Sequence, residues 1–201
     1  EKTWGYRFLR KSALDLYKFS ATADLGMSIS KDFGFLFSNL TITNGEGYKE
    51  SVVDDNSKIS LQLVHGERRL DKNDGYNLGL AYSTVKDDSD VETTVTGLFG
   101  GWAGKNFRIG AELNTQDIGE ISNQVTSIYF NYNINDDFSA FLRQDARDLN
   151  VDLDGDDDSA MMLGVIWSPT KGLSICPNIT QDKDANNVSE DSFAIDFQFK
   201  F

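Results

Sequence analysis

The closing segment of the chain, SFAIDFQFKF, carries a large apolar residue at every second position. On a β-strand, residues with this spacing lie on one face, and the residues between them lie on the other. A soluble protein can bury such a face against a core, so this strand by itself does not separate a soluble sheet from a membrane sheet. The apolar face consists of Phe193, Ile195, Phe197, Phe199 and Phe201.

The same alternation recurs throughout the chain and predicts an all-β fold. Residues 17–30 alternate without a break, and Tyr17, Phe19 and Leu25 belong to their apolar face. No segment has convincing helical spacing. Together with the closing segment, about twelve strands are expected in one antiparallel meander. The others are residues 4–8, 17–30, 33–43, 57–64, 75–83, 93–103, 107–114, 125–134, 138–145, 161–168 and 173–180.

Composition narrows the function classes. The chain has 201 residues, which suits a single domain over residues 1–201, and its 32 acidic against 19 basic residues argue against a nucleic-acid partner. Cys176 and His65 are the only residues of their types, so the sequence predicts no disulfide framework and no zinc site, and we expect no cofactor. No apolar run approaches the length of a membrane-spanning helix, and no signal peptide precedes Glu1. Because residue 1 is not Met, we expect a processed or partial chain.

The connections between the expected strands alternate between short and longer, mostly acidic ones. This asymmetry is typical of an outer-membrane β-barrel, whose turns lie in the periplasm and whose loops lie outside the cell. It also predicts a periplasmic C-terminus. The short connections are residues 30–32, 70–75, 103–106, 135–137 and 168–172, and the longer ones are residues 44–56, 86–92, 114–122, 149–158 and 181–192.

Aromatic residues are expected at two heights of such a barrel. Tyr17, Phe19 and Tyr82 fall near the loop end, and a second group falls beside the short turns. Two aromatic belts are typical of membrane interfaces. Lipid would then cover the apolar strand faces, and the sheet must close on itself because hydrocarbon satisfies no backbone group. The turn-side girdle comprises Phe33, Trp102, Phe107, Phe138, Trp167 and Phe201.

Several stretches resemble the outer-membrane porins of Gram-negative bacteria, in particular the carboxy-terminal part of phosphate-selective and other substrate-selective channels. These stretches are YRFLRKSALD, ADLG, TNGEGY, LRQDARD and LGVIWSP, together with the terminal alternation that ends in Phe201. The resemblance implies contact with outer-membrane lipid and lipopolysaccharide, recognition of the terminal strand by the insertion machinery, and a homotrimer. Such porins commonly have sixteen strands, so the chain either lacks amino-terminal strands or forms a smaller barrel.

The residues opposite the lipid-facing set predict the function. They mix both charge signs with small polar residues, and such a wall favours a water-filled channel for passive diffusion of small hydrophilic solutes or ions. The acidic loops predict a slight cation preference. A rigid, non-conducting barrel with cross-paired charges is the alternative. The predicted pore-lining residues are Lys18, Asp24, Arg108, Glu112, Arg143, Asp145, Asp196 and Lys200.

The residues also bear on a calcium site, a barrel enzyme and a soluble domain. Asp152, Asp154 and Asp156 give one loop the carboxylate density of a calcium site, but the Glu that closes an EF-hand loop is absent, which favours a solvated surface. A barrel enzyme needs a histidine beside a nucleophile or carboxylates, and His65 is expected at the turn-side rim, where it favours a structural role. A soluble all-β domain is disfavoured by the wholly apolar strand faces.

Overall fold

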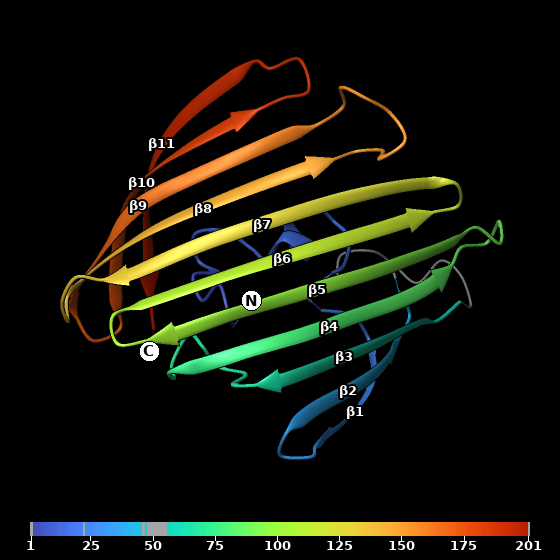
Figure 1. Ribbon diagram of the computed structural model, residues 1–201, viewed down its shortest axis with the longest axis horizontal. Helices are drawn as coiled ribbons and strands as arrows, with labels where there is room; N and C mark the ends of the chain where they lie inside the picture. The colour runs from blue at the N-terminus through green and yellow to red at the C-terminus, as the bar shows by residue number, and fades with distance from the viewer. Residues whose placement is uncertain (1, 22, 46, 48–55, 201) are drawn as a thin grey trace.

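The computed structural model describes residues 2–21, 23–45, 47 and 56–200. In this part of the chain, one short helix precedes a single sheet of eleven strands in sequence order (Figure 1). Every neighbouring pair is antiparallel, which confirms the predicted all-β meander. The elements are α1 (Ala13–Leu16), β1 (Gly26–Asp32), β2 (Leu36–Thr43), β3 (Lys58–Gly66), β4 (Gly75–Lys86), β5 (Glu92–Gly104), β6 (Phe107–Ile118), β7 (Ile121–Asn133), β8 (Phe138–Asp148), β9 (Asp158–Thr170), β10 (Leu173–Lys183) and β11 (Ser189–Phe199).

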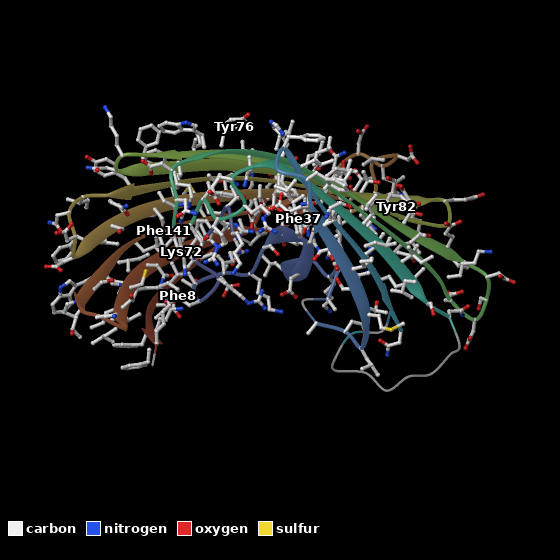
Figure 2. The ribbon with its side chains drawn as sticks, turned by 90° about the horizontal axis from the view of Figure 1, so that it is seen from below. Phe8, Phe37, Lys72, Tyr76, Tyr82 and Phe141 are labelled. Atoms are coloured by element: carbon white, nitrogen blue, oxygen red, sulfur yellow. The ribbon has the colours of Figure 1, made fainter. Side chains whose placement is uncertain are left out.

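The sheet curves into an arch, and the amino-terminal residues lie beneath it on the concave side (Figure 2). β1 and β11 form the two edges of the sheet, and no pairing joins them within the described ranges. Within the described residues the sheet is therefore open between β1 and β11, and the closure that the sequence predicts is not formed there. None of the described helices is long and apolar enough to span a bilayer.

The convex face of the sheet is apolar and exposed, and the concave face buries polar side chains beside an apolar cluster. Large apolar side chains on the convex face are exposed, as Leu98 and Ile128 illustrate at 50% and 54%. Polar side chains on the concave face are buried, and Asn114 and Ser127 are 2% and 0% exposed. Because water does not favour exposed apolar rows, this arrangement fits a convex face covered by lipid. The apolar face predicted for the closing segment is likewise exposed along β11, from Phe193 to Phe199.

The turns and loops lie at opposite ends of the strands, as predicted. Only residues 105 and 106 separate β5 from β6, and only residues 171 and 172 separate β9 from β10. The latter turn requires glycine, because Gly172 has a φ of +89° and a Cβ there would lie 2.4 Å from the Lys200 carbonyl oxygen. The expected loop 114–122 is wrong, since β6 and β7 continue as a hairpin to residues 118 and 121. Because residues 114–122 are mostly polar, they lack the apolar alternation by which a strand is predicted. The predicted loop 44–56 lies largely outside the described residues.

The first expected strand and most of the second are also wrong. Residues 4–8 form turns, α1 follows Ser12, and strand structure begins only at Gly26. Ser12 and Asp15 fit the S-x-x-D pattern, which predicts the start of a helix. The alternation of apolar residues on either side of this pattern favours strands instead. Phe19 is 4% exposed and packs on the concave side instead of facing lipid. The described residues therefore contain eleven strands, one fewer than the sequence predicts.

Candidate functional site

The candidate site is the concave face together with residues 2–21, which we call the inner segment. Polar side chains from three strands donate hydrogen bonds to it. Arg108 Nη2 donates to the Trp4 carbonyl oxygen at 2.8 Å, and Arg143 Nη1 donates to the Lys11 carbonyl oxygen at 2.7 Å. Asn77 Nδ2 donates to Thr3 Oγ1 at 3.0 Å. Since β4, β6 and β8 supply these donors, the segment is held across the middle of the sheet.

An aromatic cluster anchors the first half of the inner segment. The Trp4 ring is 1% exposed and meets the rings of Tyr129 and Phe141 edge-on, at centroid distances of 5.4 and 5.8 Å. Its indole Nε1 donates to the Arg10 carbonyl oxygen at 2.8 Å, so the polar edge of the ring is satisfied. Cys176, which is 0% exposed, belongs to the same cluster, against which Phe8 also packs.

A buried ionic network holds the second half. Asp145 accepts hydrogen bonds from Arg143 Nε at 2.8 Å and from Ser127, and Arg10 Nε lies 3.4 Å from its other oxygen. The Tyr17 hydroxyl donates to the same carboxylate at 3.3 Å. Buried charges persist only when they are paired and hydrogen-bonded, and this carboxylate has several partners. The network therefore ties residues 10 and 17 of the segment to β7 and β8.

Close backbone approach explains one glycine of β5. A Cβ at Gly101 would lie 2.4 Å from Thr3 Cγ2 and 2.8 Å from the Ile109 carbonyl oxygen. Any larger residue at this position would push the inner segment away from the wall.

The structure separates the eight predicted pore-lining residues into two groups. Arg108, Glu112, Arg143 and Asp145 project from the concave face of β6 and β8, as expected, but the inner segment covers the last two, which are 1% and 0% exposed. Asp196 also lies on the sheet and accepts a hydrogen bond from Asn178 Nδ2 at 2.8 Å.

The remaining three predicted pore residues lie at the ends of elements. Lys18 has a φ of +64° just after α1, a conformation that ends helices. Asp24 accepts the N–H groups of Leu25 and Gly45 at the loop end, both at 2.9 Å. Lys200 follows β11 at the turn end, where its N–H donates to the Gly172 carbonyl oxygen at 2.7 Å.

The connection between β3 and β4, residues 67–74, adds groups that the sequence analysis missed. It folds inward, because the Asp71 N–H donates to the Lys2 carbonyl oxygen at 2.9 Å and Leu70 is 2% exposed. Arg69 binds the Asp71 carboxylate through two nitrogens at 2.8 and 2.9 Å. The sequence of this connection, ERRLDKND, is densely charged, and it is the longest connection on the turn side. These two features could have identified it as part of the site.

The convex face carries the predicted girdle near the turn end. Trp102 and Phe107 lie 4.7 Å apart between centroids, and Phe138 stacks on Trp167 at 6.3 Å with an interplanar angle of 9°. Phe33 is 55% exposed at the same end, whereas Phe201 lies outside the described residues. Among the predicted insertion-signal residues, Phe193, Ile195, Phe197 and Phe199 are all more than half exposed, at 67%, 51%, 58% and 62%.

His65 lies at the turn-side end of β3, and the acidic loop follows β8. His65 lies in the convex aromatic region, with Nδ1 2.6 Å from the Phe35 carbonyl oxygen and Nε2 3.0 Å from the Tyr76 hydroxyl. Within the described residues, no three His, Cys, Asp or Glu side chains gather as a metal site would require. Asp152, Asp154 and Asp156, the calcium candidates of the sequence, belong to no such group among the described residues.

Comparison with known proteins supports the fold. No protein-family model and no curated protein matches the sequence. Among solved structures, OmpT, an outer membrane protein of Vibrio cholerae, superposes with a TM-score of 0.67 at 10% identity, over 89% of this chain and 65% of that one. The outer membrane channel DcaP of Acinetobacter baumannii gives 0.62 at 10% identity, over 89% and 62%.

A smaller relative by structure is the NanC porin, with a TM-score of 0.51 at 12% identity, over 88% of this chain and 92% of that one. The chain thus spans about two thirds of the length of OmpT and DcaP and nearly all of NanC. These identities carry information about architecture alone. The chain has the fold of Gram-negative outer-membrane porin barrels, as its sequence had indicated.

Proposed function

We propose that this chain is part of an outer-membrane channel through which small hydrophilic solutes or ions diffuse passively. The observation that carries the proposal is the reversed polarity of the sheet, with lipid-compatible rows outside and buried polar groups inside. The inner segment narrows the lumen and defines the path that solutes take. The fold shared with porins and channels supports the same conclusion.

We also propose that further strands close the sheet between β11 and β1. The convex rows of both edges are exposed, as Met27 at 79% and Phe197 at 58% illustrate, so both edges fit a bilayer and neither is covered. An open edge in hydrocarbon would leave backbone groups unpaired, at a cost of several kcal/mol for each group. The additional length of OmpT and DcaP is consistent with strands beyond the eleven described.

The proposed role is transport and not catalysis. A barrel enzyme needs a histidine beside a nucleophile or carboxylates, whereas His65 contacts a backbone carbonyl oxygen and a tyrosine hydroxyl on the lipid-facing side. The proposed partners are outer-membrane lipid and lipopolysaccharide around the girdle, and the insertion machinery at residues 193–201. Assembly into a homotrimer is part of the same proposal, and the native mass of the detergent-solubilised protein tests it.

The proposal is tested by fractionation and reconstitution of the full-length protein. It should fractionate with the outer membrane, migrate differently on a denaturing gel before and after heating, and give ion currents in planar bilayers. Recovery in the soluble fraction would contradict the barrel. A membrane-inserted, heat-modifiable protein that gives neither current nor liposome swelling would instead support the non-conducting barrel.

A further inference from the structure

A cavity of about 560 Å³ lies between the inner segment and the wall formed by β2 to β7. The inner segment borders it with Lys2, Thr3, Ser12 and Leu14. This size falls within the usual range for small-molecule sites, roughly 300–1,000 Å³. On its other side, the segment packs tightly on β7 to β10. The space between the segment and the wall is therefore on the side of β2 to β7.

One side of the cavity is basic. Lys2, Arg68 and Arg69 line it. Arg69 is already held by Asp71, but the nearest carboxylate oxygen to Arg68 is 3.9 Å away, on Asp32. The Arg68 guanidinium lies 4.0 Å over the Phe37 ring, and its pairing with Asp32 is longer than a hydrogen bond, so an anion can compete for its N–H groups.

The other side of the cavity offers hydrogen-bond acceptors. Glu112 lines it from β6 and Asn77 from β4. Asn77 is 5% exposed, and its Nδ2 donates to Thr3 Oγ1 at 3.0 Å and to the Glu67 carbonyl oxygen at 3.1 Å. Its Oδ1 is buried without a hydrogen-bond partner among the described residues. An unpaired buried acceptor is costly, and a donor from a bound solute would remove that cost.

We propose that this cavity is a solute-binding subsite for a small hydroxylated organic anion, of the hydroxy-acid or sugar-acid class. The carboxylate binds at Arg68 and Lys2, hydroxyl groups donate to Asn77 Oδ1 and Glu112, and the carbon skeleton packs on Phe37 and Phe99. Two aromatic rings among polar groups suit such a ligand, because its carbon skeleton is apolar and its periphery is polar. The subsite rests on the proposed channel function and specifies its substrate class.

This assignment revises the cation preference expected from the sequence. The loop end remains acidic, whereas the residues that line the subsite include Lys2, Arg68 and Arg69 beside the carboxylate of Glu112. The acidic loops repel an anion at the mouth, and the basic subsite attracts it. Because salt screens solvated charges more than partly buried ones, a higher ionic strength weakens the repulsion by the loops more than the attraction at the subsite.

The test uses the full-length protein in planar bilayers, with D-gluconate, glucose and glucosamine as probes. Gluconate should reduce the ion current at lower concentration than either of the other two. Arg68→Gln should raise the half-blocking concentration of gluconate about tenfold, the change expected for losing one charge-assisted hydrogen bond. The matched control is Lys72→Gln, which removes the same charge from the same loop but lies outside the cavity, and it should change the value less than twofold.

Calorimetric titration of gluconate into the detergent-folded protein separates the subsite from conduction. Binding that Arg68→Gln weakens supports the subsite even if no current is found, in which case only the channel proposal fails. Current without gluconate block or binding keeps the channel and overturns the subsite. Stronger block by glucosamine, or equal effects of Arg68→Gln and Lys72→Gln, would also overturn it.

Discussion

The inner segment and β11 contain similar aromatic patterns but place them in opposite environments. Trp4 and Phe19 of the segment are 1% and 4% exposed under the arch, whereas Phe193 and Phe197 of β11 are 67% and 58% exposed on its convex face. β11 pairs along its whole length with β10. Among the described residues the segment pairs with no strand, and side chains of the wall bind it instead.

The difference shows that period-two alternation is not sufficient for a membrane strand. In β11, the residues between the aromatics are small or polar and leave a regular concave face. In the segment, Arg10 falls in the row of Trp4, Tyr6 and Phe8 and interrupts it, beside a helix-start signal. Long cations in a row that must face lipid would be costly, and in the lumen they find carboxylates and carbonyl groups.

The largest expected effect comes from truncating a ring in each region. Trp4→Ala removes the centre of the aromatic cluster and should cost about 3–5 kcal/mol in docking the inner segment. The buried Cys176 belongs to this cluster, so its labelling by a charged thiol reagent should become at least tenfold faster. Phe197→Ala is the control, because its ring contacts lipid, and it should leave the labelling rate nearly unchanged. Equal acceleration in both variants would contradict the proposed docking.

The next effect distinguishes the two faces of β11. An Arg in place of Ile195 would lie in hydrocarbon near the middle of the strand and should cost about 2–4 kcal/mol. Ala194→Arg places the same side chain on the opposite face and should cost little. Denaturant unfolding of the two variants in lipid vesicles measures the difference. Similar unfolding midpoints would show that the assigned register is wrong.

A smaller effect is expected from the ionic network. Asp145→Asn keeps the shape of the side chain but removes the charge that Arg143 and Arg10 contact, and it should cost about 1.5–3 kcal/mol. Denaturant unfolding, read together with Cys176 labelling, measures this loss. Asp196→Asn is the control, since Asp196 binds only the Asn178 amide among its described partners. If the control destabilises the protein as much, the network does not hold the segment in place.

The smallest effect concerns Asp148, at the loop end of β8 and outside the membrane. Burial and the neighbouring Asp157, Asp156 and Asp154 carboxylates raise the pKa of Asp148. A raised folded-state pKa means that ionised Asp148 destabilises the loop end, and that this penalty disappears as the pH falls below its ordinary value. Asp148→Asn should therefore raise the unfolding temperature slightly at pH 7 and have no effect near pH 3. A stabilisation that persists at the lower pH would exclude this electrostatic cause.

Much of the sheet could be predicted from the sequence because lipid-facing rows must be apolar along their whole length. The rows of β4 to β11 are largely apolar, and Trp102 and Trp167 lie exposed on the convex face near the turns, where the membrane girdle is predicted. The strand ends could not be predicted in the same way. Beyond the bilayer, both faces meet water, so the alternation disappears while the backbone pairing continues through the β6–β7 hairpin.

The interior was predicted less well, because contacts between distant residues decide it. Arg143 and Asp145 were placed on the correct face, but no local pattern shows that residues 4–17 will cover them. Lys2, Arg68 and Asn77 lie far apart in the sequence and meet only through the inner segment and the inward-folded turn. Single residues on the concave face carry little periodic signal, so their grouping depends on tertiary structure.

The three tryptophans test most directly whether the convex face contacts lipid while the inner segment lies in the lumen, because they lie in these two environments. Trp102 and Trp167 are 42% and 43% exposed on the convex face, and Trp4 is buried in the lumen. Single-tryptophan variants of the full-length protein, made by Trp→Phe replacement of the other two, can be reconstituted with brominated phospholipids, which quench fluorescence on contact. The account predicts strong quenching of Trp102 and Trp167 and almost none of Trp4. Quenching of Trp4 equal to that of the other two would place the inner segment in lipid and contradict the account.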